Sequence, residues 1–298
     1  MALGRPLKQA TLAQRRGTWG KVQIVPQENV TATVWIQRTH LAYRVMPPQL
    51  SSEHSRHLLY SIAAELRACL RTRRSHRPAL AYTAFDFADD AIWRAALSAE
   101  GWEELSHADR FHLQLEDKHD FLLSVPGLEW EWSRMPERPS PAAIHILNKA
   151  WSDSADPLTV VRTGQPGAYL KDYANFKLEV HLGIAREHRE PVALVILGLP
   201  PPTATESEAW ILDLVVVPDC RRRGMGSMAL AQALDVLRLS GVRKTFALID
   251  RHNEPSIRVH RSLGFERCDG PYRTYLLRHY HAKAELDDAG SGSQADFA

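Results

Sequence analysis

The 298-residue chain lacks several features that would point to particular classes of protein. It has only three cysteines, Cys69, Cys220 and Cys268, which are widely spaced and form no Cys-x-x-Cys pair. This argues against a disulfide framework or a structural zinc site and favours a reducing compartment. No apolar run approaches the roughly 18 residues of a membrane-spanning helix, and the N-terminus has no apolar signal core. The net charge of +2 is too small to indicate nucleic acid or a membrane surface as a partner. We therefore expect a cytoplasmic protein without a metal.

The chain is long enough for two modest domains, and its composition is that of a globular protein, with 44% hydrophobic and 24% charged residues. The Gly/Ser/Asp/Ala-rich tail, 281–298, and the first residues, 1–18, are expected to be flexible. A Val-Pro-Gly sequence at 125–127 marks a boundary. It separates a first unit, 19–125, from a second domain, 126–280. Nothing in the pattern decides between a monomer and a homodimer.

The second domain is predicted to be α/β (α+β), with a strand, a helix, three strands, a helix, a strand, a helix and a last strand. Its strongest apolar run, Trp210–Val217, is rich in β-branched residues, as expected for a central strand buried on both faces. The predicted strands are 129–135, 177–185, 192–199, 210–217, 245–249 and 272–277, and the helices begin near Pro141, Gly226 and Pro255.

The first unit carries a faint copy of this later pattern. Asp90-x-x-Trp93-x-x-x-Leu97-x-x-x-Gly101-Trp102 aligns with Asn253-x-x-Ser256-x-x-x-His260-x-x-x-Gly264-Phe265 at a constant offset of 163 residues. Upstream, a predicted helix at 53–71 and a strand at 79–85 match the later helix and strand. We therefore predict that one supersecondary unit occurs twice.

The segment VVPDCRRRGMGS, from Val216 to Ser227, is the most informative in the chain. A strand ends, a basic loop follows, and two glycines, Gly224 and Gly226, open a helix. Glycine lets the backbone approach a ligand closely, and the first N–H groups of a helix have no partner within it. Together with the helix dipole and neighbouring arginines they form an anion site suited to a pyrophosphate. A tight turn with solvated arginines is the alternative.

Two motifs in this domain resemble those of the GCN5-related N-acetyltransferase (GNAT) superfamily. Arg221-x-x-Gly224-x-Gly226 is similar to its pyrophosphate signature R/Q-x-x-G-x-G/A. Asn253-x-x-Ser256-x-x-x-His260-x-x-x-Gly264-Phe265 is similar to its second signature, N-x-x-A/S-x-x-x-Y-x-x-x-G-F. The resemblance covers about half the chain, and it implies a splayed, mixed and mostly antiparallel sheet flanked by helices, preceded by a partial, degenerate copy.

The resemblance also implies a reaction, in which an acetyl group passes from acetyl-CoA directly to a primary amine on a small molecule or peptide. The pantetheine would pair with the central strand and the pyrophosphate would lie on the glycine-led loop. The residues implied in cofactor binding are Leu214, Val215, Val216, Val217, Arg221, Arg222, Arg223, Gly224, Met225, Gly226, Ser227, Asn253 and Ser256.

Two residues are candidates for proton transfer. His260 stands where the family has tyrosine, and a histidine could replace that phenol as the acid for the departing thiolate, or it could simply pack or cap. Asp213 is a carboxylate in an otherwise apolar strand, so it needs a partner. It could receive the amine proton or bind a cationic acceptor, or it could form a structural hydrogen bond.

The sequence also has features that fit three other interpretations. Gly224-x-Gly226-x-x-Ala229 also fits a dinucleotide motif, but six residues separate it from the strand and too few βαβ units remain. A non-catalytic acyl-CoA-binding sensor or scaffold is favoured by the missing tyrosine. The arginine cluster at 67–77 could bind nucleic acid, although cations at a helix C-terminus are the simpler interpretation.

Overall fold

In the computed structural model, the described residues are 19–24, 32–38, 43–46, 48–50, 58–71, 78–83, 90–115, 128–173, 178–201 and 208–277. The boundary predicted at 125–127 and the two flexible ends predicted for 1–18 and 281–298 lie outside these residues.

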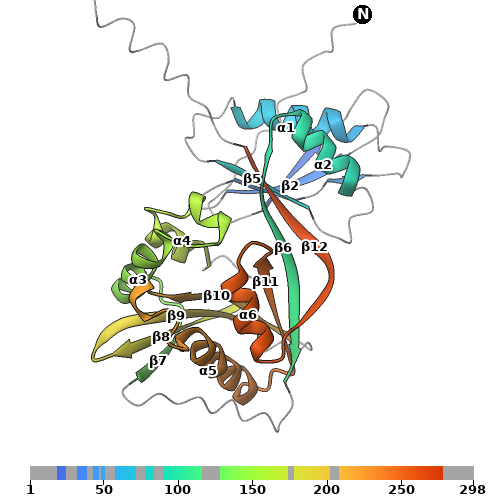
Figure 1. Ribbon diagram of the computed structural model, residues 1–298. Coiled ribbons are helices and arrows are strands. Elements are labelled where there is room, and N and C mark those ends of the chain that lie inside the picture. The colour runs from blue at the N-terminus through green and yellow to red at the C-terminus, as the bar shows by residue number, and fades with distance from the viewer. Residues whose placement is uncertain are drawn as a thin grey trace, which may run out of the picture.

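The strands form one continuous mixed sheet in the order β1-β2-β3-β5-β12-β6-β11-β10-β9-β8-β7, with β4 paired to β2 (Figure 1). Antiparallel pairs predominate, and the parallel pairs are β10 with β11 and β3 with β5. This confirms the predicted α/β class, and the antiparallel pairing of β9 with β10 excludes the dinucleotide-binding topology. The strands are β1 (Trp19–Ile24), β2 (Ala32–Arg38), β3 (Tyr43–Val45), β4 (Gln49–Leu50), β5 (Ala79–Thr83), β6 (Glu103–Gln114), β7 (Leu128–Arg134), β8 (Glu179–Glu187), β9 (Glu190–Leu199), β10 (Glu208–Val216), β11 (Lys244–Asp250) and β12 (Glu266–Leu277).

Helices flank both parts of the sheet, with α1 and α2 on the N-terminal part and the others on the C-terminal part (Figure 1). They are α1 (Leu58–Arg71), α2 (Asp90–Ala99), α3 (Pro141–Trp151), α4 (Pro166–Tyr173), α5 (Met225–Leu239) and α6 (Glu254–Ser262), with short 3-10 turns η2 (Pro157–Val161) and η3 (Pro218–Cys220). Helix α3 begins as predicted, because the Ser140 hydroxyl accepts from the Ala143 N–H at 3.5 Å and Pro141 takes the first turn.

The repeat is visible in the strands at the centre of the sheet. Strands β6 and β12 have the same length, and their first residues, Glu103 and Glu266, are 163 residues apart, as are their last residues, Gln114 and Leu277. Gly101 and Gly264, each before its strand, both have a positive φ, 75° and 88°. The two halves of the chain therefore repeat one α-β unit.

The two units exchange strands. β12 lies between β5 and β6, and β6 lies between β11 and β12, so each unit contributes a strand that completes the other (Figure 1). The packing follows the same exchange, because Tyr275 and Leu277 of β12 belong to the core of the N-terminal unit, while Phe111 and Leu113 of β6 belong to the C-terminal core.

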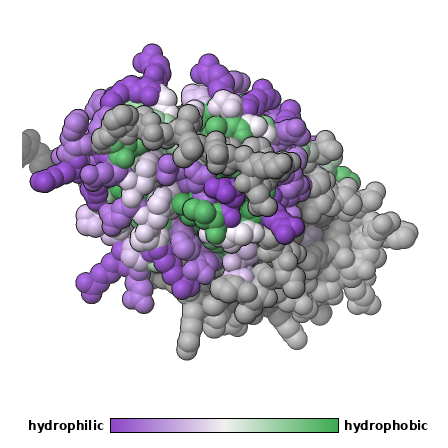
Figure 2. All heavy atoms as spheres, turned by 90° about the horizontal axis from the view of Figure 1, so that it is seen from below, coloured by the Kyte–Doolittle hydropathy of each residue, from purple (hydrophilic) through white to green (hydrophobic). Residues whose placement is uncertain are grey.

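The surface of the described residues, seen from below in Figure 2, is mostly hydrophilic, with small separate apolar patches. Scattered patches of that size are ordinary on a protein surface.

Candidate active site

The central strand β10 separates from β11 partway along its length. The two pair in parallel only from Glu208–Ile211 against Lys244–Ala247. On its other side β10 stays paired with β9 as far as Val216, and the Val217 N–H continues with a 3.0 Å bond to the Val192 carbonyl. The sheet thus opens beside Leu214 to Val217, the stretch predicted to pair with a pantetheine.

Asp250 at the end of β11 holds that strand on the side of β6. Its carboxylate accepts hydrogen bonds from the Ser106 hydroxyl at 2.7 Å, the His107 N–H at 2.8 Å and the His252 N–H at 2.9 Å. Asp250 is 5% exposed, so these bonds replace the water that an ionised carboxylate requires. These bonds therefore hold the end of β11 next to β6, which keeps it apart from β10 where the sheet opens.

The loop after β10 leads into the N-terminus of α5 through two residues with positive φ, Arg222 (58°) and Gly224 (77°). The first backbone bond of the helix runs from the Met228 N–H to the Gly224 carbonyl at 3.1 Å. The N–H groups of Met225, Gly226 and Ser227 precede it and have no partner within the helix. Such a concave set of N–H groups, with the helix dipole behind it, is suited to an anion.

The three arginines of this loop differ in what they contact. Arg221 is the anchor of the loop: Nε donates to the Val216 carbonyl at 3.0 Å, Nη2 to the Ala150 carbonyl at 3.1 Å, and Nη1 to Asp153 at 2.7 Å. Arg223 pairs with Glu187 at 2.6 Å, while Arg222 is exposed. The motif arginine thus holds the loop against the end of α3.

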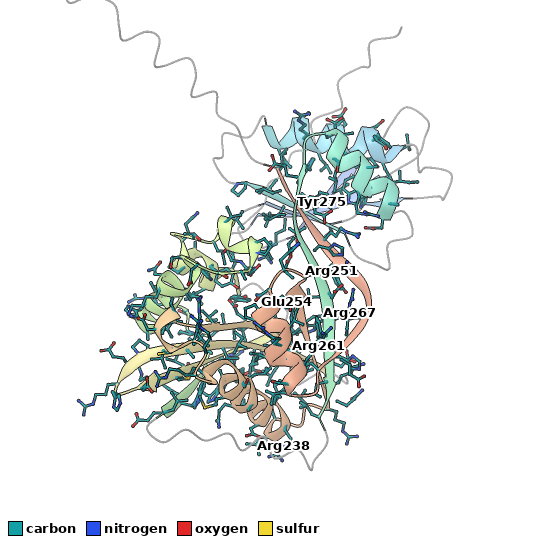
Figure 3. The ribbon with its side chains drawn as sticks, in the orientation of Figure 1. Arg238, Arg251, Glu254, Arg261, Arg267 and Tyr275 are labelled. Carbon is teal, nitrogen blue, oxygen red and sulfur yellow. The ribbon has the colours of Figure 1, made fainter. Side chains whose placement is uncertain are left out.

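The second motif lies on α6, whose N-cap is Asn253 (Figure 3 shows Glu254 and Arg261 on this helix). The Asn253 side chain accepts from the Ser256 N–H at 3.3 Å, the capping role of an Asn at this position. Val259 of α6 faces Gly226: a Cβ at that glycine would lie 3.4 Å from a Val259 methyl. Gly226 thus also lets α5 and α6 pack closely.

His260 is buried in this motif, with 2% of its surface exposed, and packs edge-on against Phe265. Its Nδ1 lies 2.9 Å from the Ser256 carbonyl oxygen, which can only accept, so Nδ1 carries the proton. Burial lowers the pKa of His260 to about 4. In this neutral tautomer Nε2 has no proton to donate, so donation from Nε2 would require the other tautomer or the protonated ring, and the role of His260 as an acid stays a prediction.

Asp213, directly before the stretch where the sheet opens, belongs to a polar cluster with side chains of α4 and η2. The Tyr169 hydroxyl donates to Asp213 Oδ2 at 2.7 Å, and the Tyr173 hydroxyl contacts that of Tyr169. Because the single Tyr169 proton goes to the carboxylate, Tyr173 must donate to Tyr169. Burial raises the pKa of Asp213, and the Arg162 guanidinium and the Tyr169 hydrogen bond partly oppose the rise.

The partners of Asp213 were not predicted from the sequence. Arg162 lies with its guanidinium 4.8 Å from the centre of the Tyr169 ring and pairs with Asp156 at 2.9 Å. Tyr169 and Tyr173 are one turn apart on α4, and this Tyr-x-x-x-Tyr spacing is the one signal in the sequence that could have found them.

A residue of the N-terminal unit has a small electrostatic effect on this cluster. Burial raises the pKa of Tyr173, and the charges of Arg162 and, to a lesser extent, Arg44 of β3 oppose the rise. At the other end of that unit, Arg67 of the predicted arginine cluster pairs with Glu100 at 3.3 Å. Residues 72–77, which complete that cluster, lie outside the described residues.

Two other titratable side chains have structural partners. Glu179 contacts Arg134 and His181. The Tyr275 hydroxyl donates to Glu104 at 2.9 Å near the upper end of β12, far along that strand from Arg267 (Figure 3). Among the described residues, no group of three or more His, Cys, Asp or Glu side chains is placed to hold a metal ion.

A mixed sheet that opens between two parallel strands, next to a helix that begins at glycine, is the arrangement of the GNAT fold. Residues 141–265 match the family model described as the Acetyltransferase (GNAT) family, a segment that runs from α3 through both motifs to Phe265. Residues 141–265 therefore form a domain of the GNAT superfamily. None of the described helices is long and apolar enough to span a membrane.

Solved structures share the fold over most of the chain. A tandem GNAT protein from the clavulanic acid biosynthesis pathway is 17% identical, with a TM-score of 0.59 over 85% of this chain and 80% of its own. GCN5-related N-acetyltransferases from Sphaerobacter thermophilus (13% identity, TM-score 0.54, 84% and 76% covered) and Kribbella flavida (14%, 0.52, 90% and 92%) are also similar. No match is found among curated proteins.

Proposed function

We propose that this chain transfers an acetyl group from acetyl-CoA directly to a primary amine on a small molecule or peptide. The observation that carries the proposal is the opening of the sheet at Leu214–Val217, which leads to the free N–H groups at the start of α5. A free strand edge that leads directly to an anion site fits a ligand with amides at one end and a pyrophosphate at the other.

Several features of the chain fit acetyl-CoA. Gly224 has nothing within 4 Å of where a Cβ would lie, so the backbone there is open to a ligand. Arg221 fixes the loop, and the exposed Arg222 is available to contact phosphate. When bound, acetyl-CoA supplies the activated acetyl thioester. The protein supplies the N–H groups of residues 225–227, the β10 edge and the positioning of the acceptor.

Asp213 is the proposed base. An attacking amine must lose a proton, and a carboxylate whose pKa is raised by burial is a better acceptor of it than one in water. Tyr169 fixes the position of that carboxylate through its 2.7 Å hydrogen bond. We assign the proton transfer to Asp213 with Tyr169 as a positioning residue, and we leave His260 as a buried neutral group of α6.

The test is coenzyme A release from acetyl-CoA with a panel of primary amines, using the full chain and its variants. Asp213→Asn keeps the size of the side chain and removes the base, so kcat/KM should fall by roughly 10²- to 10⁴-fold. Acetyl-CoA affinity should be unchanged in this variant. Full turnover by Asp213→Asn would remove Asp213 from the mechanism.

Tyr169→Phe is the matched test of positioning. The Tyr169 hydrogen bond favours the ionised carboxylate and so lowers the pKa of Asp213. Its loss should move the rising limb of the kcat/KM profile to higher pH.

If acetyl-CoA binds and no amine in the panel is acetylated, the chain binds acyl-CoA without catalysis and the proposal fails.

We also propose a cytoplasmic location, supported by the free thiols of Cys220 and Cys268.

A further inference from the structure

A second feature of the sheet is a cavity of about 590 Å³ at the other end of the β10–β11 contact, lined by residues of both units. Glu208 and Lys244, the first residues of β10 and β11, lie in its wall, so it is separated along the strands from the point where the sheet opens. It is lined by Arg110, His112, Glu208, Lys244, Phe246, Arg267 and Cys268.

The cavity and Asp213 lie on the same face of the sheet. Trp210 and Asp213 are in register with Gly198 and Ile196 of β9, two residues apart, because a bulge at Leu212 adds one residue to β10. Phe246 is in turn the register partner of Trp210. Without this bulge, alternation would place Asp213 and the cavity on opposite faces.

The lining of the cavity is cationic. Three of its residues carry permanent positive charge, Arg110, Lys244 and Arg267, against one carboxylate, Glu208. Arg267 pairs with Asp109 at 2.9 Å. The other two cations flank Phe246, with Arg110 5.4 Å and Lys244 4.9 Å from the ring centre, which holds both charged groups beside the cavity. An anion is the ligand that this charge favours.

The floor between the cavity and Asp213 is apolar. The Trp210 and Phe246 rings are 5.1 Å apart, and Leu248, two residues beyond Phe246 on the same face, is 46% exposed although large and apolar. Measured along β9, the position beside Lys244 and the position beside Asp213 are about four residues apart. At roughly 3.3 Å per residue, the two sites are on the order of 10 Å apart.

We propose that this cavity binds the anionic end of the amine acceptor, while the amine lies at Asp213. The acceptor is then an elongated molecule with a carboxylate or another anion on the order of 10 Å from its amine and an apolar middle. This inference rests on the proposed function, and it makes Lys244 and Arg110 determinants of specificity.

The probes for the test are trialanine and trialanine amide, which share the same amine and length and differ in the charge at the far end. Three extended residues span roughly 10 Å. Binding of each to the full chain is measured by calorimetry with coenzyme A present, which cannot transfer an acetyl group. Wild type should bind trialanine at least about tenfold more tightly than its amide, as a charge-assisted hydrogen bond provides.

Lys244→Gln should abolish this preference and leave the amide affinity unchanged. Arg243→Gln is the control, because it removes the same charge one residue earlier at an exposed position outside the cavity. A preference that persists in Lys244→Gln, or that is lost equally in Arg243→Gln, overturns the proposal. So does equal binding, or no binding, of both probes.

Acetyl-CoA binding is measured on the same samples. Its absence would refute the proposed function whatever the trialanine result, whereas normal acetyl-CoA binding without a carboxylate preference would refute only the cavity assignment.

Discussion

Replacing His260 by leucine should remove a large part of the acid sensitivity of the fold. His260 is 2% exposed, and burial lowers its pKa from 6.5 to about 4. Between these two values the unfolded chain binds a proton at this position and the folded chain does not. The stabilising effect of the neutral state is therefore fully present above pH 6.5 and is lost as the pH falls towards 4.

The size of the effect follows from the difference in pKa. Each unit corresponds to about 1.36 kcal/mol, so the histidine accounts for about 3 kcal/mol of unfolding free energy across this range. That is a considerable part of the 5–15 kcal/mol typical of a folded protein. Leucine suits the site, because Leu97 holds the equivalent position in the N-terminal unit and is itself fully buried.

The assay is urea unfolding of wild type and His260→Leu at several pH values between 4 and 7. The difference between the two free energies cancels contributions from other groups and should change by about 3 kcal/mol, with the variant gaining as the pH falls. His145→Leu, at an exposed position of α3, is the control and should follow wild type. If wild type and His260→Leu lose stability in parallel, His260 is not held neutral by the fold.

Three further predictions concern the coenzyme site and the repeat. Gly224→Ala should lower the free energy of unfolding in urea by about 1–2 kcal/mol, because φ at this position is 77°, and it should also weaken acetyl-CoA binding measured by calorimetry. Gly164→Ala is the control: its φ is 78° but it lies away from the loop, so it should lower stability without changing acetyl-CoA binding. Arg221→Ala should lower both stability and acetyl-CoA affinity because it releases the loop, whereas Arg222→Gln should lower affinity only. A fragment of residues 126–280 lacks β6 and should show little cooperative thermal unfolding by circular dichroism.

The elements with a clear periodicity could be predicted from the sequence. The central strand and helix α5 were placed within two residues of their observed bounds, because each combines a long apolar pattern with a proline or glycine boundary. Helix α4 was missed because it has only eight residues, too short for periodicity to stand out. Strand β12 begins six residues earlier than predicted, in a polar stretch at Glu266.

The candidate site could be predicted only in part. The glycine motif predicted the turn that leads into α5, since the positive φ at Gly224 is a property of the local sequence, and anion binding by this loop stays a prediction. It did not reveal that Arg221 contacts Ala150 and Asp153, because those residues lie about 70 positions away. Asp213 was found because a carboxylate in an apolar strand is conspicuous, but its partner Tyr169 comes from another element, and the Tyr-x-x-x-Tyr spacing there does not point to Asp213.

The strand exchange gives a reason for the N-terminal unit to persist although its loop at 47–53 has no glycine to hold a pyrophosphate. A unit kept only for its own ligand site would be free to degenerate as a whole. This one supplies β6, whose Ser106 and His107 hold Asp250 and thereby the β11 side of the opening. It also brings the charge of Arg44 to the tyrosine cluster. We therefore propose that the N-terminal unit supports the C-terminal site through β6, so mutations of Ser106 should lower the proposed activity without removing any residue of the C-terminal domain.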